Sequence, residues 1–218
     1  MSQFQKNCDI LQKYIPEGAV KVIAGWIIRD DFKLRITRAR HTKLGDYRSP
    51  IDGGNHKISI NYNLNKFSFL ITLVHEIAHL HTFNKFGMRA APHGQEWKSE
   101  YIRLMEGFLH PDIFPTDIMV ALQSHLNAPT AASCSDLELQ RVLKRHDVGA
   151  LQKSLIFLEQ LPDGSFFKNE GGKYFKKGNR VRTRFRCTDL SGKHIYLFHP
   201  LAEVQPVAEN SIVREPEK

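Results

Sequence analysis

The chain has 218 residues, of which 41% are hydrophobic and 25% are charged, so it can bury a core and form one globular domain with a smaller second one. No apolar run approaches the roughly 18 residues that a membrane-spanning helix needs, the N-terminus lacks the pattern of a secretory signal, and three scattered cysteines exclude a disulfide framework. We expect a cytoplasmic protein with no membrane partner, and the formal net charge of +8 suits an anionic partner.

The first part of the chain mixes helical and strand patterns, which predicts an α+β fold. Residues 3–15 carry apolar side chains at helical spacing, and Pro16 ends the pattern. The β-branched and aromatic segments 20–28 and 32–40 predict strands. Residues 56–63 predict a further strand because apolar and polar residues alternate there.

Helical patterns dominate the next stretch. Residues 64–83 predict a long apolar helix, and residues 95–109 predict an amphipathic one. A shorter helix is expected over residues 116–126. The sequence therefore predicts a first domain of residues 1–126.

The remainder of the chain predicts a connector and a small second domain. Residues 127–150 predict a linker and a connecting helix capped by Ser135. Residues 151–207 predict an all-β module, because short strand patterns alternate with turn signals such as Lys177-Gly178-Asn179. Residues 208–218 are polar and predict a flexible tail.

The segment TLVHEIAHLHTF, residues 72–83, places three histidines and one glutamate in an otherwise apolar helix. His75, Glu76 and His79 form an HExxH motif, in which the two histidines lie one turn apart on the same face and can reach one metal ion. Imidazole suits zinc, and a catalytic zinc site keeps three protein ligands and an open position for water. We therefore expect one catalytic zinc ion, with Glu76 as the general base that takes a proton from water.

A third metal ligand must lie downstream of the motif. The metzincin extension is excluded because Thr82 and Lys85 occupy the positions of its glycine and histidine. His93 is the best candidate, since it directly precedes the next predicted helix. Glu96 and Glu100 on that helix remain as alternatives.

Two further side chains near the motif have open roles. His81 lies two residues after His79 and faces roughly the opposite side of the helix, so it is expected to support the site rather than to bind the metal. The group that stabilises an oxyanion opposite Glu76 is not identified, and Tyr101 and His81 are both candidates.

The two histidine segments, LVHEIAHL and APHGQEW, resemble those of the SprT-like metalloprotease family, which includes the Spartan-like proteases of DNA–protein crosslinks. The preceding ITRARHTKLGDYRS and HKISINYNLN are similar to that family's lead-in, and the resemblance covers about residues 15–110. It implies a zincin-like domain that hydrolyses peptide bonds, with zinc bound by His75, His79 and His93 and with Glu76 as the general base. It also implies a protein substrate that is associated with DNA or crosslinked to it.

The C-terminal module departs from that family's pattern. RTRFRCTDLSGKHIYLF resembles the second half of a four-cysteine zinc ribbon, but Cys187 is the one cysteine in it, and Leu190 stands where a second would be. One local thiol cannot build such a site, so we expect a degenerate, metal-free β module in which Cys187 is a small buried residue.

A basic segment of this module is a candidate nucleic-acid surface. Residues 168–193 hold nine Lys and Arg against two Asp and Glu, and RVRTRFR predicts a strand whose four arginines share one face. The candidate contacts are Arg180, Arg182, Arg184, Arg186, Lys176 and Lys177. Candidates for stacking on bases are Phe167, Tyr174 and Phe175. A second basic cluster precedes the motif and comprises Lys33, Arg35, Arg38, Arg40 and Lys43.

These observations favour a zinc-dependent metalloprotease that acts on proteins near or attached to DNA, with single-stranded or damaged DNA as a further partner. A nucleic-acid-binding protein whose zinc site is structural or inactive is the alternative. A general peptidase with incidental surface charge is a third hypothesis. The oligomeric state is not encoded in any pattern that the sequence displays.

Overall fold

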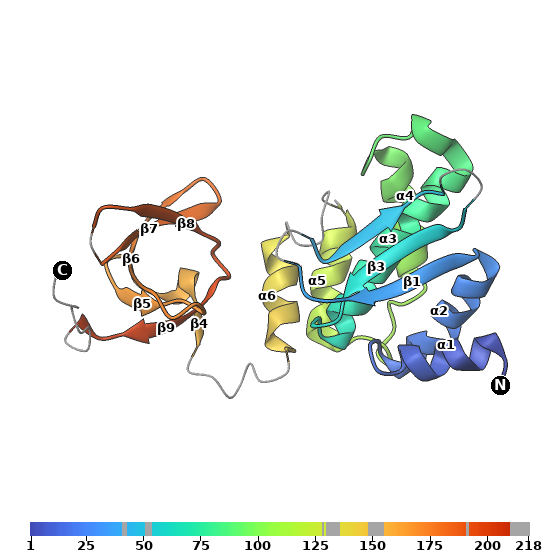
Figure 1. Ribbon diagram of the computed structural model, residues 1–218, viewed down its shortest axis with the longest axis horizontal. Helices are drawn as coiled ribbons and strands as arrows, with labels where there is room; N and C mark the ends of the chain where they lie inside the picture. Colours follow the sequence, from blue (N-terminus) through green and yellow to red (C-terminus); the bar gives the residue numbers. More distant parts are fainter. Residues whose placement is uncertain are drawn as a thin grey trace. The chain divides into compact units, whose positions relative to one another are not determined.

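The computed structural model describes residues 1–40, 43–50, 54–127, 129, 136–147, 155–190 and 192–209 (Figure 1). The chain divides into two compact units, Met1–Asp147 and Val148–Lys218. Helices and a three-stranded sheet form the first unit, and a six-stranded sheet makes up most of the second. This mixture confirms the predicted α+β class. The polar tail predicted from residue 208 lies outside the described residues from residue 210 onward.

The first unit consists mainly of helices, together with three strands. Its helices are α1 (Gln3–Leu11), α2 (Glu17–Arg29), α3 (Lys66–Phe86), the short 3-10 helix η1 (Gly87–Arg89), α4 (Gln95–Glu106), α5 (Thr116–Asn127) and α6 (Leu137–Arg145). Its strands are β1 (Phe32–Thr37), β2 (Gly45–Arg48) and β3 (His56–Asn61). None of the described helices is both long and apolar enough to cross a membrane.

The three strands form a sheet with β3 at its centre. β1 runs parallel to β3 on one side, and β2 runs antiparallel to it on the other. α3 packs against the sheet on the face that carries the buried side chains of Ile58 and Ile60 (Figure 1). Because alternate residues of a strand point to opposite faces, Lys57 and Ser59 lie on the other face of the sheet.

α3 is the helix that carries the HExxH motif, and it is buried over most of its length. Asn65 caps its N-terminus, since the side-chain oxygen accepts hydrogen bonds from the backbone N–H groups of Phe67 and Ser68. Gly87 ends the helix in the left-handed region, with φ of 61°. A buried helix fixed at both ends holds its polar side chains at constant positions relative to the sheet and to α4.

The strand predicted over residues 20–28 is wrong, because this segment belongs to α2. The buried residues Ala19, Val20, Ile23 and Ala24 recur at helical spacing and form one apolar face. β-branched side chains favour strands only weakly. Burial of this face therefore outweighs the local preference of the segment for strand.

β2 is a strand that the sequence patterns do not predict. It is only four residues long, and its exposed and half-buried positions do not alternate clearly enough to be recognised in the sequence. Pairing with β3 stabilises it. The position of β2 beside α3 determines the geometry of the site that is described below.

The helix predicted within the connector of residues 127–150 is α6, and it is part of the first unit. α6 buries its apolar face in the core of that unit, and the side chain of Asn65 donates a hydrogen bond to the carbonyl of Leu143. Asp136 caps the helix, whereas the predicted cap residue Ser135 lies outside the described residues. The boundary between the units therefore lies after Asp147 and not near residue 126.

The second unit is built from short strands. They are β4 (Ile156–Phe157), β5 (Phe166–Lys168), β6 (Tyr174–Val181), β7 (Arg184–Asp189), β8 (Ile195–Phe198) and β9 (Glu203–Val207), with the 3-10 helix η3 (Leu158–Gln160) after β4. The sheet has the order β4-β9-β5-β6-β7-β8 and curls around an apolar interior (Figure 1). Phe167, Phe175 and Cys187 lie in this interior, with Cys187 fully buried.

The single strand predicted for RVRTRFR is wrong, because the chain reverses within it. β6 ends at Val181 and β7 begins at Arg184, with Arg182 in the turn at φ of 54°. The turn predicted at Lys177-Gly178-Asn179 is instead an irregularity within β6. Gly178 is needed there, because a β-carbon would lie 2.6 Å from the carbonyl oxygen of Arg186.

Candidate metal centre

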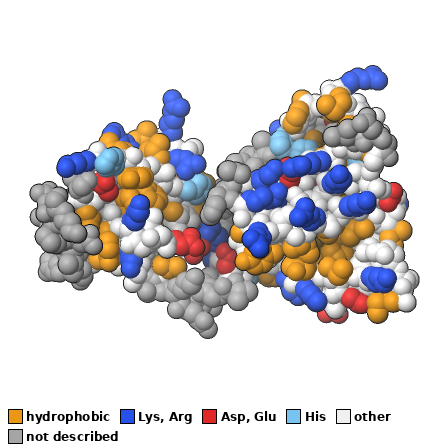
Figure 2. All heavy atoms as spheres, in the orientation of Figure 1, with side chains coloured by type: hydrophobic (Ala, Val, Ile, Leu, Met, Phe, Trp, Pro, Cys, Tyr) orange, Lys and Arg blue, Asp and Glu red, His pale blue; other side chains and the backbone are white. Residues whose placement is uncertain are grey.

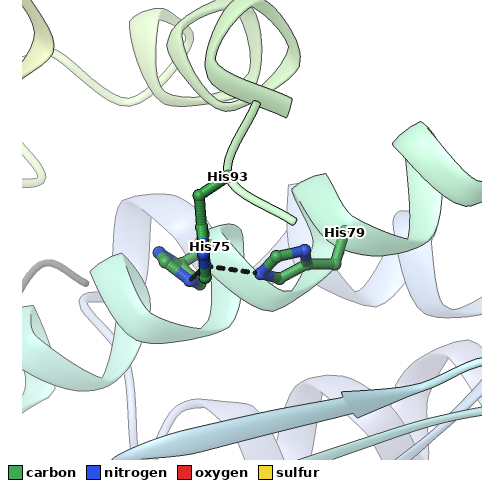
Figure 3. Close-up of side chains that lie close together, drawn as sticks. All are labelled: His75, His79 and His93. Carbon is green, nitrogen blue, oxygen red and sulfur yellow. Dashed lines mark hydrogen bonds between the residues drawn. The ribbon is translucent and has the colours of Figure 1, made fainter. Parts of the chain in front are cut away.

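Three histidine rings converge beside α3. His75 and His79 lie one turn apart on this helix, and His93 reaches them from the loop before α4 (Figure 3). The Nε2 atom of His93 is 3.2 Å from Nε2 of His75 and 3.0 Å from Nε2 of His79. The structure therefore brings together the three residues that were predicted as metal ligands.

His93 owes its position to an unusual backbone conformation. Its φ of 58° lies in the left-handed region, which is costly for a residue with a side chain. The following residue, Gly94, is the N-cap of α4, and its N–H donates to the carbonyl of Ala91 in a tight turn. The turn and the positive φ together aim the His93 ring at α3, as Figure 3 shows.

The three rings form a donor set that suits a metal cation. Burial lowers the pKa of His75 to about 2 and that of His79 to about 4, and it also lowers the pKa of His93. The rings are therefore neutral near pH 7, and His93 can donate its Nε2 hydrogen to only one of its two neighbours. Neutral imidazole nitrogens that face one point are ligands that Zn²⁺ accepts, so these residues fit a metal ion and could hold one.

Two aromatic side chains fix the orientation of the histidines. The buried indole of Trp97 on α4 lies 4.6 Å from the ring of His75 and 4.7 Å from that of His93, measured between ring centroids. Tyr47 on β2 stacks on His79 with its ring nearly parallel, at an interplanar angle of 6°. The Tyr47 hydroxyl and Nδ1 of His56 are 2.9 Å apart, which ties this ring to β3.

Glu76 is the buried carboxyl group of the site, with 7% of its surface exposed. Burial, and to a lesser extent the charge of Asp46, raise the pKa of Glu76 to about 8, although the backbone N–H of Tyr47 donates a hydrogen bond to the carboxylate. A carboxylate with such a raised pKa is a stronger base than an exposed one. Glu76 directly follows His75 in the chain, and in its ionised form it can accept a proton there.

Gly45 on β2 makes the space that Glu76 occupies. A β-carbon at position 45 would lie 2.4 Å from Oε1 of Glu76 and 2.8 Å from Cγ2 of Thr72. No real contact of this kind is so short, and both neighbours belong to the buried helix α3. Glycine is therefore the residue that lets β2 approach the carboxyl group.

A second group of polar atoms lies behind the histidines without a hydrogen-bond partner. Nδ1 of His75, Nε1 of Trp97, the hydroxyl of Tyr101 and Nε2 of His125 are all buried and unpartnered within the described structure. The other ring nitrogen of His125 is 2.9 Å from Oδ2 of Asp136. Histidines that bind a metal usually donate their second ring N–H to a neighbour, and Nδ1 of His75 has no such acceptor among the described residues.

Glu100 and His81 belong to a separate ion cluster. Nε2 of His81 is 2.8 Å from Asp30, and its Nδ1 is 2.9 Å from Glu100, so both ring nitrogens are engaged by carboxylates. Glu100 also accepts hydrogen bonds from Lys85 and Arg103. His81 is therefore not placed to bind the metal, as expected, and it contributes to this ion cluster, in which the Glu100 carboxylate is also engaged.

Neither candidate for the oxyanion-stabilising group is both unpartnered and accessible in this geometry. The nitrogens of His81 are occupied in the ion cluster, and the hydroxyl of Tyr101 is fully buried behind the histidines. Glu96, the other alternative to His93 as a metal ligand, is exposed on the first turn of α4. Among the described residues, the group that could hold a metal ion is formed by His75, His79 and His93.

The predicted nucleic-acid residues of the second unit fall into two groups. Arg180, Arg182, Arg184, Arg186 and Lys176 are exposed. Lys177 is buried with 3% of its surface exposed, and its ammonium group donates to the carbonyl of Leu161 and lies 3.3 Å from Asp163. The prediction of Lys177 as a surface contact is therefore wrong.

The candidates for stacking on bases are also mostly buried. Phe167 and Phe175 pack against each other in the core of the second unit, with their ring centroids 5.6 Å apart, so they cannot contact a ligand on the surface. Tyr174 is half-buried, and the ammonium group of Lys168 lies over its ring.

Sequence reasoning did not assign roles to Gly45, Tyr47 or Trp97, which shape the site. The L-G-x-Y pattern at residues 44–47 and the tryptophan four residues after His93 are visible in the sequence. Their function depends on contacts between β2, α3 and α4 that no local pattern encodes.

One comparison with known proteins bears on this site. Residues 13–113 match the model of the SprT-like family. No curated protein and no solved structure matches the chain. The matched segment contains β2, the HExxH helix and the loop with His93. The similarity to the SprT-like family therefore lies within the first unit of the chain.

Proposed function

We propose that this protein is a zinc-dependent endopeptidase of the SprT type. The family is associated with metallopeptidase-like activity and is typically metal-dependent. The observation that carries the proposal is the convergence of the Nε2 atoms of His75, His79 and His93 on the helix that also holds the buried Glu76. Three ligands with an adjacent carboxyl group match the composition of a catalytic zinc site.

A zinc ion bound by the three histidines would act as a Lewis acid that lowers the pKa of water towards about 7. Hydrolysis adds water across the peptide C–N bond, and Glu76 accepts the proton that the attacking water loses. The protonated Oε of Glu76 then gives this proton to the nitrogen of the leaving amine. Trp97 and Tyr47 hold the histidine rings in place during these steps, so the donor set does not have to reorganise.

The surroundings of Glu76 support its role as a proton carrier. A pKa of about 8 lies close to neutral pH, where a group can both accept and release a proton. The backbone N–H of Tyr47 orients the carboxylate, and Gly45 leaves room for it.

For the substrate we propose proteins that are bound or crosslinked to nucleic acid. Support comes from Arg184 and Arg186, which are exposed on the same face of β7, with Arg182 exposed in the adjoining turn, because exposed arginines suit phosphates. The alternative function is a nucleic-acid-binding protein whose metal site is structural or inactive, and the same arginines favour it.

The test is cleavage of a DNA-bound protein with and without single-stranded DNA, and with and without a chelator. We expect cleavage that requires metal and disappears in Glu76→Gln while the zinc content stays the same. Intact DNA binding without cleavage under any of these conditions would establish the alternative function.

The ligand assignment has a separate test. His93→Ala should lower the zinc content and change the visible spectrum of the cobalt-substituted protein. Glu96→Gln, on the exposed first turn of α4, is the matched control and should leave both unchanged. A His93→Ala variant that keeps full zinc content would overturn the assignment.

A further inference from the structure

The open face of the three-stranded sheet is strongly basic. Because side chains alternate along a strand, the residues that point away from α3 form one surface. They are Lys33, Arg35 and Thr37 on β1, Lys57 and Ser59 on β3, and Asp46 and Arg48 on β2. Figure 2, in the orientation of Figure 1, shows Lys and Arg side chains gathered over this sheet.

The strand register places like charges next to each other. Lys33 lies opposite Lys57 in the parallel pair, and Lys57 lies opposite Arg48 in the antiparallel pair. Three cations therefore form one row across three adjacent strands. Like charges directly opposite each other destabilise a sheet, so this row costs folding free energy unless an anion lies over it.

Arg40 completes a groove over this face. Its guanidinium group lies over β3, where it donates to the side chains of Asn61 and Ser59 and to the carbonyl of Ser59. The resulting groove has a volume of about 370 Å³. Among the described residues, its lining comprises Lys33, Arg35, Thr37, Arg40, Asp46, Arg48, Lys57, Ile58 and Ser59.

The positive charge of the groove is not neutralised from within. Five of the lining residues are cations and one, Asp46, is an acid. Asp46 is already paired with Lys43 at 2.6 Å and Arg48 at 2.9 Å. Lys33, Arg35 and Lys57 form no ion pair with any described residue, so they are available to an external anion.

We propose that this groove, which we call the sheet groove, binds single-stranded nucleic acid through its phosphates. A row of cations across roughly 10 Å of sheet matches one phosphate backbone lying in a channel. None of the described residues that line the groove is aromatic, so bases are not stacked there and binding is independent of sequence. The salt dependence of binding should follow the number of phosphates that the groove neutralises.

The sheet groove and the candidate metal centre lie on opposite faces of the sheet and share strand β2. On β2, Asp46 and Arg48 face the groove, whereas Gly45 and Tyr47 face Glu76 and His79 on the opposite side. A nucleic acid in the groove would hold a protein attached to it close to these residues. This consequence rests on the proposed peptidase function, whereas the binding itself does not.

The test measures binding of fluorescent single-stranded DNA to the full chain carrying Glu76→Gln, so that cleavage cannot affect the result. In this background, the triple variant Lys33→Gln, Arg35→Gln, Lys57→Gln should bind about tenfold or more weakly. The slope of log K against log salt should fall by about two, because three phosphate contacts are lost at roughly 0.7 each.

The matched control removes the same charge elsewhere. Lys6→Gln, Lys13→Gln and Lys21→Gln change exposed lysines on α1, in the turn after it and on α2. This variant should keep the affinity and the salt slope. Equal losses in both triple variants would overturn the proposal, since net charge alone would then explain binding.

Two further arms identify the ligand and its position. Single-stranded DNA with an abasic aldehyde, trapped on lysine amines by borohydride, should label Lys33 and Lys57. Labelling confined to the second unit would contradict the proposal. So would duplex DNA or polyglutamate that bound through the same three residues as tightly as single-stranded DNA or more tightly. Single-stranded RNA should bind similarly, because the contacts are to phosphates.

Binding and catalysis can be separated with a variant that keeps Glu76. The groove triple variant should cleave a protein substrate that is free of nucleic acid at the normal rate, and it should cleave a DNA-bound substrate more slowly. If the protein with its native groove cleaved neither substrate but bound single-stranded DNA there with the expected salt dependence, the proposed function would be contradicted. The groove assignment would remain intact.

Discussion

Gly45 on β2 and Glu76 on α3 are in direct contact. The carboxyl group of Glu76 occupies the space that a side chain at position 45 would need. A β-carbon at position 45 would come within 2.4 Å of Oε1. The strand thus sets the position and the environment of the proposed base, which also accepts a hydrogen bond from the backbone of Tyr47.

Gly45→Ala should therefore abolish peptidase activity while zinc stays bound. The added methyl group collides with Oε1 of Glu76 and with Thr72, so the carboxyl group must move or β2 must shift. His75, His79 and His93 do not depend on that contact. The measurement is the cleavage rate together with zinc content and the thermal midpoint.

Gly25→Ala is the matched control for this substitution. Gly25 lies within α2, and an added β-carbon meets no atom within 4 Å. Alanine should stabilise the helix by up to about 1 kcal/mol and leave cleavage unchanged. If Gly45→Ala behaved like this control, the contact between β2 and Glu76 would have no catalytic role.

The candidate site was predictable to different degrees. The HExxH spacing identified His75, Glu76 and His79 because four residues make about one helical turn, and His93 followed from its place before the next helix. Gly45 and Trp97 were not assigned because their roles arise from contacts between elements distant in sequence. Local periodicity carries no information about such contacts.

Glu100→Gln should destabilise the first unit. Burial opposes ionisation of Glu100, but hydrogen bonds from Arg103, Lys85 and His81 outweigh it and lower its pKa to about 2. The substitution removes a buried carboxylate from a cluster of cations, and we expect a loss of order 2 kcal/mol at pH 7. Urea unfolding of the metal-free proteins measures this difference.

The pH dependence of that difference has a defined sign. Because the folded-state pKa is below the ordinary value of 4.5, the stabilisation is fully present above about pH 5 and is lost as pH falls towards 2. The gap between the wild type and Glu100→Gln should therefore narrow over this range. Glu96→Gln, exposed on the same helix, should show no such gap, and a gap that widened in acid would contradict the assigned pKa shift.

The fold was predictable where burial on one face produces a clear period. Residues 56–61 alternate and form β3, and the long apolar segment around the motif forms α3. Residues 20–28 were misassigned because β-branched residues suggested a strand, although the apolar positions also fit a helix that packs into the core. In RVRTRFR, arginines alternate with other residues as in a single strand, but the chain turns at Arg182. The turn is not predicted because it contains no glycine or proline.

Lys57→Gln should stabilise the sheet. It removes the central cation of the row formed with Lys33 and Arg48, and the relief should be roughly 0.2–1 kcal/mol at low salt. Screening reduces this gain, so it should shrink as the ionic strength rises. The urea midpoint at low and high salt measures it, with Lys21→Gln as the control. A loss of stability at low salt would mean that the row is not repulsive.

Lys177 and the exposed arginines of the β6–β7 hairpin should respond differently to substitution. Lys177→Met removes a buried ammonium group that donates to Leu161 and lies 4.0 Å above the ring of Phe185, so it should destabilise the second unit by about 1–3 kcal/mol. The protein that remains folded should bind single-stranded DNA normally. Lys176→Gln, one residue earlier and exposed, should leave stability unchanged.

Replacing Arg184 and Arg186 by glutamine should have the opposite effect. Both side chains are exposed on β7, so stability should stay within about 0.5 kcal/mol of the wild type, while DNA affinity falls and the salt slope decreases by about 1.4. Urea unfolding and DNA titration of each variant separate the two quantities.

If Lys177→Met lost DNA affinity without losing stability, the ammonium group would have to be accessible to phosphate. Its burial against Leu161 and Phe185 would then not describe the protein in solution.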